Sequence, residues 1–273
     1  MTNPKQHSCR PTVLATDLDG TLIPLPDEPQ NQFDLMHLSE RIRQQSLTLV
    51  YVTGRHLALT LDAIRQHRLP PPDWLIADVG TSMFRRISAS EFVPVSGYFS
   101  HLQEIQSGIP LSELGTRLTS VAGVRLQEPE KQGEFKLSLY VDADRLQALQ
   151  VRIEAILKSL SASCRIISSV DPFNGNGLID LLPASVSKAY ALDWWIRHRR
   201  MDPQHVVFAG DSGNDLAALT AGYRAIVVGN AASSVVSAVK KTHRQNGWND
   251  RLYLARQRAT SGVLEGCRWF DVV

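Results

Sequence analysis

Two pairs of acidic residues have a spacing that suits chemistry on phosphate. Asp17 and Asp19 are separated by one residue and Asp211 and Asp215 by three, and each pair follows a short apolar run. Like charges held this close resist joint ionisation, so such pairs are costly without a balancing cation. Mg²⁺ prefers oxygen ligands together with the phosphate groups of a substrate. The spacing therefore predicts a magnesium site that binds a phosphorylated molecule.

A hydroxyl and a cation stand between the two acidic pairs in the chain. Thr53 and Lys188 are of the types that bind the equatorial oxygens of a phosphoryl group during its transfer. Asp215 falls in the first turn of a predicted helix, where the helix dipole favours a carboxylate. Thr53 alone would also suit the N-cap of a helix that begins near residue 57.

The elements that must position these residues are short buried strands that alternate with helices. Runs without a polar face predict strands covered on both sides, at 13–15, 47–52, 74–77, 206–209 and 225–228. Helical patterns follow at 33–45, 57–68 and 214–221. This alternation predicts an α/β fold with a doubly wound parallel sheet, that is, a Rossmann-like core. Ligands bind beyond the carboxyl ends of such strands, so we expect the acidic pairs and Thr53 to converge on one crevice.

The middle of the chain has a different pattern. We predict an inserted α+β domain over residues 86–183 and a core formed by residues 1–85 and 184–273. The insert contains a strand with one polar face at 135–141, an amphipathic helix at 146–160, and strands at 165–169 and 178–182. These elements predict an antiparallel sheet whose apolar face packs on its own helices.

The polar face of the first strand in the insert carries Lys136, Ser138 and Tyr140. Because strand residues alternate between the two faces of a sheet, we expect these three side chains to look outward. A polar sheet face turned toward a crevice would suit a lid.

Composition excludes several classes of protein. The chain has 273 residues, 43% of them hydrophobic and 21% charged, which rules out a disordered, collagen-like or disulfide-stapled chain. Lys and Arg number 29 against 27 Asp and Glu, and the basic clusters are short, so we expect neither a nucleic-acid nor a membrane partner. Cys9, Cys164 and Cys267 show no metal-type spacing. With no apolar run long enough for a bilayer, we expect a cytoplasmic protein with reduced thiols.

Four motifs, in this order and spacing, resemble the haloacid dehalogenase superfamily of phosphotransferases. The large insert between the threonine and lysine motifs is similar to the second cap type of that superfamily, which implies a catalytic core and a cap domain that determines substrate specificity. The motifs are Asp17-Leu-Asp19-Gly-Thr21, Thr53-Gly-Arg55, Lys188 and Gly210-Asp211-Ser-Gly-Asn214-Asp215.

Within the superfamily the chain most resembles the sucrose-phosphate phosphatases and their relatives that act on phosphorylated disaccharides. The resemblance covers most of the chain. It rests on Tyr51-Val-Thr53-Gly-Arg55, Ala77-Asp-Val-Gly80-Thr81, Phe135-Lys136-Leu-Ser138, Leu178-Ile-Asp180-Leu-Leu182-Pro183, and a tail from Leu252-Tyr-Leu-Ala-Arg256 to Gly262-Val-Leu-Glu265-Gly266.

The resemblance implies a role for each motif residue. Asp17 would be the nucleophile and form an aspartyl-phosphate, and Asp19 the general acid and then base. Mg²⁺ would be held by the Asp17 carboxylate, the Asp19 backbone carbonyl and Asp211, with Asp215 orienting a metal-bound water or Lys188. The substrate-binding candidates are Thr53, Gly54, Arg55, Lys136, Ser138, Lys188 and Asn214.

The implied function is a Mg²⁺-dependent phosphatase of a phosphorylated disaccharide, with sucrose 6-phosphate as the first candidate. The substrate is then a small sugar phosphate, and the synthase that makes it is a candidate partner. Alternatives are a phosphatase of mannosylfructose phosphate or another sugar phosphate, and a phosphomutase such as a phosphomannomutase. A non-catalytic module, either an aspartate-phosphorylated signalling protein or an inactive partner of a synthase, is a third hypothesis. An insert of ~100 residues exceeds ordinary loop lengths and argues against the signalling module.

Overall fold

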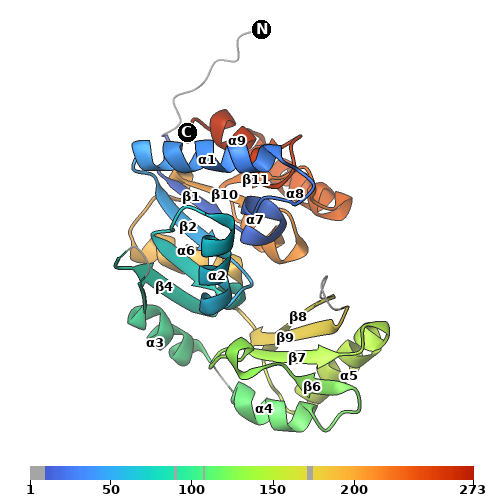
Figure 1. Cartoon of the computed structure of the whole chain (residues 1–273). Helices are drawn as coiled ribbons and strands as arrows, with labels where there is room; N and C mark the ends of the chain where they lie inside the picture. The colour runs from blue at the N-terminus through green and yellow to red at the C-terminus, as the bar shows by residue number, and fades with distance from the viewer. Residues whose placement is uncertain (1–9, 89–90, 107, 171–174) are drawn as a thin grey trace. The chain divides into compact units, whose positions relative to one another are not determined.

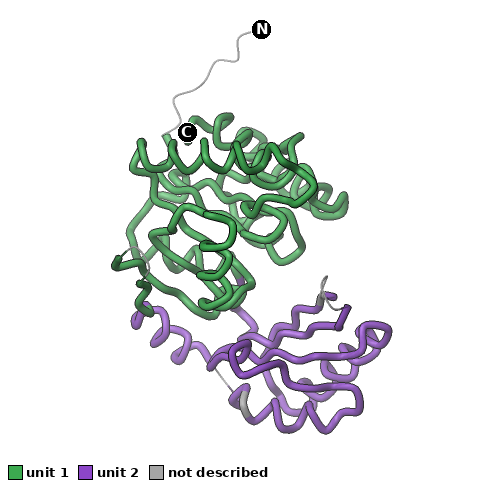
Figure 2. The backbone as a smooth tube through the Cα atoms, in the orientation of Figure 1, with its two compact units in different colours: residues 1–94, 188–273 green, residues 95–187 purple. Residues whose placement is uncertain are grey.

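The computed structural model describes residues 10–88, 91–106, 108–170 and 175–273, which fall into two compact units. One unit runs up to residue 94 and resumes at 188–273, and the other covers 95–187 (Figure 2). We call them the core unit and the insert unit. Within the described residues, the core unit contains an eight-stranded sheet and the insert unit a four-stranded one.

The sheet of the core unit is mainly parallel, with β1 (Val13–Thr16) near its centre (Figure 1). β1 pairs in parallel with β10 (Val206–Gly210) on one side and with β2 (Thr48–Val52) on the other. From β1 the chain adds β2 and β3 on one side of the sheet, and later β10 and β11 on the other side. In a doubly wound sheet, ligands bind beyond the carboxyl ends of the strands at this switch, which here are β1 and β10. The order of the sheet is β12-β11-β10-β1-β2-β3-β4-β5.

The outer strands complete this sheet. On the β10 side, β11 (Arg224–Val227) and β12 (Leu252–Leu254) continue the parallel pairing. On the β2 side, β3 (Trp74–Ala77) is parallel, whereas β4 (Ser82–Arg86) and β5 (Phe92–Pro94) are antiparallel. The five strands predicted from apolar runs are all present, and the prediction of an α/β fold with a parallel core sheet is confirmed.

Helices cover both faces of this sheet (Figure 1). On one face, side chains such as Leu14, Leu49 and Val207 pack in one cluster with residues of α1 (Gln30–Gln44), α2 (Leu57–His67) and α9 (Ala259–Trp269). On the other, α6 (Lys188–His198) contacts β3 and α7, α7 (Leu216–Leu219) contacts β10 and β11, and α8 (Ser233–Gln245) packs on α7. The helix predicted at 214–221 is shorter than expected because residues 213–215 form a tight 3₁₀ turn.

The insert unit has an antiparallel sheet, as the sequence predicted, and its strand order is β6-β7-β9-β8. The strands are β6 (Val124–Leu126), β7 (Leu137–Val141), β8 (Cys164–Val170) and β9 (Gly177–Pro183). Its helices are α3 (Ser96–Ile105), α4 (Leu111–Leu118) and α5 (Leu146–Ser159). Leu137, Leu139 and Val141 of β7 pack in the apolar core with Leu114 and Ile153, so the predicted alternation along β7 is correct.

The polar side chains of this region do not face solvent, so the expectation that they look outward is wrong. Lys136, Ser138 and Tyr140 are at most 8% exposed. The reason is that residues 127–132 cover this face of β7. The Lys131 carbonyl oxygen lies 3.0 Å from the Ser138 hydroxyl oxygen, and Lys131 Nζ donates to the Tyr140 hydroxyl (2.7 Å).

Two further expectations concern the membrane and the thiols. In the part of the chain that the structure describes, no helix combines the length and the apolar character that a bilayer crossing requires. Cys164 and Cys267 form no disulfide, and Cys9 lies outside the described residues.

Candidate active site

The first acidic pair lies on a tight turn that follows β1. The Asp17 N–H donates to the carbonyl oxygen of Ala209 (2.9 Å), which extends the pairing with β10 by one residue. The turn at Leu18–Leu22 is closed by a bond from the Ile23 N–H to the Leu18 carbonyl (2.9 Å). Gly20 has φ +70°, and a Cβ there would lie 2.6 Å from Asp211 Oδ2. Only glycine therefore lets the turn approach Asp211 this closely.

The second acidic pair lies on a loop that winds around the Asp215 carboxylate. Asp215 Oδ2 accepts hydrogen bonds from the N–H groups of Asp211 (3.2 Å) and Ser212 (3.1 Å) and from the Ser212 hydroxyl (3.0 Å). This is a capping box at the start of the turn that leads into α7. The loop in this way carries Asp211 back toward the end of β1.

Lys188, the first residue of α6, is fully buried between the two acidic pairs. Its Nζ lies 2.8 Å from Asp17 Oδ1 and 2.7 Å from Asp215 Oδ1. A buried ammonium requires such partners because removing a charge from water is costly. Asp215 thus accepts from Lys188 at Oδ1, whereas its Oδ2 faces the donors of the loop.

Asp17, Asp211 and Asp215 form a cluster that could hold a metal ion. One carboxylate oxygen of each lies within 4.8 Å of the others. The Thr21 hydroxyl donates to Asp211 Oδ1 (3.1 Å) and orients that carboxylate. Three carboxylates face one ammonium, so negative charge remains after Lys188 is counted. An all-oxygen donor set with excess negative charge suits a hard divalent cation.

The pKa values in the cluster reflect the shortage of positive charge. Burial and then the charge of Asp215 raise the pKa of Asp17 well above its ordinary value, although Lys188 opposes the rise. The same two causes raise the pKa of Asp211 to about 6. Burial alone would lower the pKa of Lys188, but Asp17 and Asp215 outweigh it and raise that pKa. A divalent cation would supply the charge that keeps both aspartates ionised.

Asp19 and Arg55 join the turn after β1 to the loop after β2. Arg55 Nε donates to Asp19 Oδ2 (2.8 Å) and Arg55 Nη2 to Asp19 Oδ1 (2.6 Å), a two-point ion pair. The Asp19 side chain is 55% exposed, unlike the cluster residues, so it can meet a bound molecule. The sequence indicated both residues as candidates but did not predict that they pair.

Thr53 and Gly54 come directly after β2. Thr53 is fully buried, and its hydroxyl accepts a hydrogen bond from the Arg55 N–H (3.1 Å). The alternative that Thr53 caps α2 is wrong, because the N-cap is His56, whose ring accepts from the Leu59 N–H (3.4 Å). Gly54 is half-buried.

The remaining candidates differ in exposure. Asn214 is exposed, and its Oδ1 lies 2.8 Å from the Ser212 hydroxyl oxygen. In the insert unit, Lys136 is buried, and the fully buried Ser138 hydroxyl donates to Asp180 (2.6 Å).

One residue near the turn was missed by the sequence analysis. Asn230 Nδ2 donates to the carbonyl oxygen of Gly20 (2.8 Å). Its place just after β11, at the carboxyl edge of the same sheet, is the signal that could have identified it.

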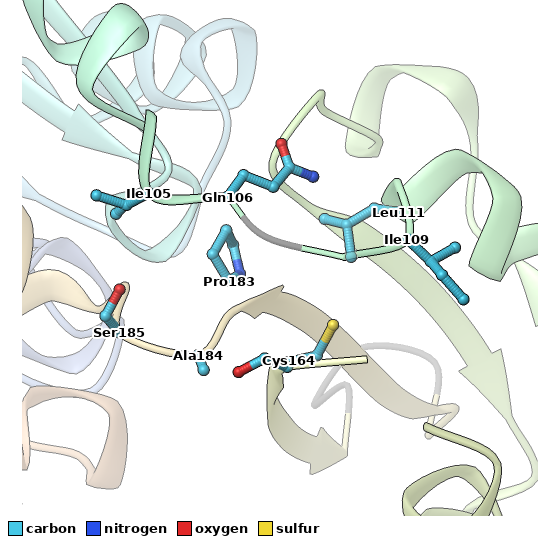
Figure 3. Close-up of a pocket in the computed structure, with 9 residues that line it drawn as sticks. Ile105, Gln106, Ile109, Leu111, Cys164, Pro183, Ala184 and Ser185 are labelled. Carbon is cyan, nitrogen blue, oxygen red and sulfur yellow. The ribbon is translucent and has the colours of Figure 1, made fainter. Parts of the chain in front are cut away.

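A hollow of about 180 Å³ in the insert unit lies among the end of α3, the start of α4, the start of β8 and the end of β9 (Figure 3). Of the described residues that line it, Cys164 is the one with a titratable side chain. Burial raises the pKa of this thiol, which makes it a poor nucleophile. No residue of the acidic cluster lines the hollow, so it offers no comparable chemistry.

Comparisons with known proteins agree with this geometry. A family model described as sucrose-6F-phosphate phosphohydrolase matches residues 10–271. A Nitrosococcus oceani protein described as a HAD-like hydrolase is 35% identical over 94% of this chain and 71% of its own length. The mannosylfructose-phosphate phosphatase of Agrobacterium fabrum is 30% identical over 94% of this chain and 95% of its own length.

The fold is also similar to that of a solved structure. The sucrose-phosphatase of Synechocystis sp. PCC6803, solved in complex with sucrose and phosphate, aligns with a TM-score of 0.75 and 24% identity. The alignment covers 96% of this chain and 99% of that chain, so the haloacid dehalogenase fold extends over both units.

Proposed function

The chain belongs to the sucrose-6F-phosphate phosphohydrolase family of the haloacid dehalogenase superfamily, and from that membership we propose that its substrate is a phosphorylated disaccharide, with sucrose 6-phosphate as the first candidate. It is a phosphoric monoester hydrolase, a sugar-phosphate phosphatase of that family. The observation that supports phosphatase chemistry is the buried Lys188 ammonium, which lies between Asp17 and Asp215 beside Asp211.

In the proposed reaction Asp17 attacks phosphorus in line and forms an aspartyl-phosphate while the sugar leaves. Asp19 protonates the leaving sugar oxygen and then accepts a proton from the water that hydrolyses the intermediate. Arg55 orients the Asp19 carboxylate through its two hydrogen bonds. Lys188 holds Asp17 in place and offsets the negative charge that gathers on the phosphoryl oxygens.

The proposed cation is Mg²⁺, held by the Asp17 carboxylate, the Asp19 backbone carbonyl and Asp211, and it would neutralise charge on the phosphoryl oxygens. Asp215 would act through Lys188, which binds its Oδ1, and through the loop that binds its Oδ2.

Substrate recognition is proposed for both units. In the core unit, the phosphoryl group would be bound by Lys188, Thr53, Gly54, Arg55 and Asn214. We propose that residues 95–187 form the cap that reads the sugar, with Lys136 as a contact. Ser138 is fully buried, and its hydroxyl donates to the carboxylate of Asp180, which is half-buried. Ser138 would therefore act through Asp180.

The test is Mg²⁺-dependent phosphate release from a panel of sugar phosphates. The panel contains sucrose 6-phosphate, mannosylfructose phosphate, glucose 6-phosphate and mannose 6-phosphate. We expect kcat/KM for one disaccharide phosphate to exceed those of both monosaccharide phosphates by about 10²-fold, because unfilled polar positions in a cap site are costly. Equal, slow rates on all four compounds would contradict the assignment to a disaccharide.

A second candidate substrate is mannosylfructose phosphate. It is favoured by the 30% identity to the Agrobacterium fabrum phosphatase, compared with 23% to the sucrose-phosphatase 1 of Nicotiana tabacum. The same panel separates the two sugars. A phosphomutase would instead yield an isomerised sugar phosphate with little free phosphate, so product analysis distinguishes it from both.

A further inference from the structure

The tail motif from residue 252 to residue 266 has no part in the proposed reaction. Its loop is nevertheless held firmly. Glu265 Oε2 accepts hydrogen bonds from the N–H groups of Arg256 (2.9 Å) and Gln257 (3.0 Å), and the Gln257 carbonyl accepts from the Gly229 N–H (2.8 Å). These bonds fix the loop against the segment that follows β11.

That segment carries Asn230, whose side chain joins the tail to the turn after β1. Asn230 Oδ1 accepts from the Ala259 N–H (2.8 Å), and Asn230 Nδ2 donates to the Gly20 carbonyl (2.8 Å). The oxygen of the Asn230 amide accepts from the Ala259 N–H, so the NH₂ group of the same amide faces the Gly20 carbonyl. Ala259 has φ +44°, a conformation that residues other than glycine rarely adopt.

A second bond from the tail reaches the same turn. The fully buried Thr260 hydroxyl donates to the Leu22 carbonyl (2.6 Å). Gly20 and Leu22 are the neighbours of Thr21, whose hydroxyl orients the Asp211 carboxylate. The backbone of Gly20 also packs directly on Asp211. The hydrogen bonds from Asn230 and Thr260 therefore hold the backbone on both sides of Thr21. We call these two bonds the tethers.

We propose that Asn230 is a positioning residue, supported by Thr260, which fixes the Asp17–Leu22 turn so that the carboxylates can bind a divalent cation. The inference deepens the proposed function, since it concerns the cation site of the same cluster. Hydrogen-bond partners of metal ligands typically affect metal affinity or activity by ~10-fold to 100-fold. Asn230 is uncharged, so its replacement by alanine tests position without altering the charge of the cluster.

The experiment measures Mg²⁺ binding by calorimetry on the full chain without substrate, followed by kcat and KM on the best substrate of the panel. Asn230→Ala removes both amide bonds, and Thr260→Val removes the second tether with little change in volume. We expect the Kd for Mg²⁺ to rise about 10-fold in N230A and by less in T260V. We expect kcat at fixed Mg²⁺ to fall while KM for the sugar phosphate stays within about twofold.

The matched control is Asn31→Ala. Asn31 is buried and binds the same tail, donating to the Arg258 carbonyl (3.2 Å) and the Ser261 hydroxyl (2.8 Å), but it connects the tail to Leu25 beyond the turn. We expect N31A to lower the melting temperature and to leave the Kd for Mg²⁺ unchanged. A wild-type Kd and kcat in both N230A and T260V would overturn the inference, as would an equal loss of affinity in N31A. Mg²⁺ binding by a wild-type protein that hydrolyses no sugar phosphate would count against the proposed function alone.

Discussion

At the scale of single residues, the site is governed by an imbalance of charge. Lys188 satisfies one oxygen each of Asp17 and Asp215, and Asp211 gains a neutral hydroxyl from Thr21. The acidic residues and the lysine were predictable because their types and spacing are visible in the sequence. The pairing of Asp19 with Arg55 was not, because nothing local indicates which of several cations a partly exposed carboxylate will meet.

The first prediction concerns the nucleophile. Asp17→Asn keeps the size of the side chain and removes one of the crowded charges, so we expect a folded protein. Phosphate release should fall by about 10³-fold or more, because an amide cannot form the acyl-phosphate. The measurement is the initial rate at saturating substrate, with circular dichroism to verify folding. Turnover near the wild-type rate would place the nucleophile elsewhere.

The second prediction concerns stability without metal. Burial and then the charge of Asp215 raise the pKa of Asp211 to about 6, so at pH 7.5 its ionised form opposes folding. Asp211→Asn should stabilise the metal-free protein by about 1 to 2 kcal/mol, discounted for partial exposure. Urea unfolding in EDTA measures the change. Mg²⁺ should stabilise the wild type and have little effect on D211N.

The control for this experiment is a carboxylate outside the cluster. Asp27 is exposed and pairs with Arg258 (2.9 Å). Because water screens the charges of such a surface pair, Asp27→Asn should leave stability unchanged or slightly reduced. Stabilisation of D27N equal to that of D211N would point to net charge of the whole chain and not to crowding in the cluster.

At the scale of elements, the strands were predicted well and the tethers between their ends were not. Strands such as β1 and β10 read as continuous apolar runs because helices cover both faces. The bonds from Asn230 to Gly20 and from Thr21 to Asp211 join residues 210 and 190 positions apart. No local pattern reports such contacts. The cover of 127–132 over β7 was missed for the same reason, since alternation identifies a face but not what packs on it.

The third prediction concerns Glu265, which holds the loop before α9. Although partial burial tends to raise the pKa of Glu265, hydrogen bonds from the Gln257 N–H, the Tyr253 hydroxyl and the Arg256 N–H outweigh it and lower that pKa. A lowered folded pKa contributes stability that is present above the unfolded value, about 4.3, and is lost as the pH falls through the folded pKa.

Glu265→Gln should therefore lower stability by about 1 kcal/mol at pH 7 and by less at pH 3.5. The measurement is the difference in melting temperature between E265Q and the wild type across this range, because other carboxyls titrate equally in both proteins. A difference that does not change with pH would mean that the charge of Glu265 is not what holds the loop.

At the scale of the whole molecule, the proposed function assigns the chemistry to the core unit and the reading of the sugar to the insert unit. The acidic cluster, Lys188 and the Asp19–Arg55 pair all belong to the core unit, whereas Lys136 and Ser138 belong to the insert unit. The existence of the insert was predictable from the change from two-sided to one-sided strands. The identity of the sugar was not predictable, because under the proposed function it depends on which side chains the insert unit leaves available.

The fourth prediction follows from this division. Residues 95–187 are exchanged for the matching segment of the Agrobacterium fabrum phosphatase, which aligns over 95% of its own length. The ratio of kcat/KM for mannosylfructose phosphate and sucrose 6-phosphate should come within about threefold of that of the donor enzyme. Hydrolysis of p-nitrophenyl phosphate serves as the control and should keep its wild-type kcat. If the exchanged protein keeps the wild-type ratio of kcat/KM, residues outside the insert unit select the sugar.

Lys188 is the first residue after the insert unit and the first of α6. Any exchange of the insert must therefore leave residue 188 at the same position in this helix. A slip of one residue turns a helix by about 100°, which would swing the ammonium away from its two carboxylates. The helix that follows therefore fixes the point at which any inserted segment, whatever its length, must return to the core unit.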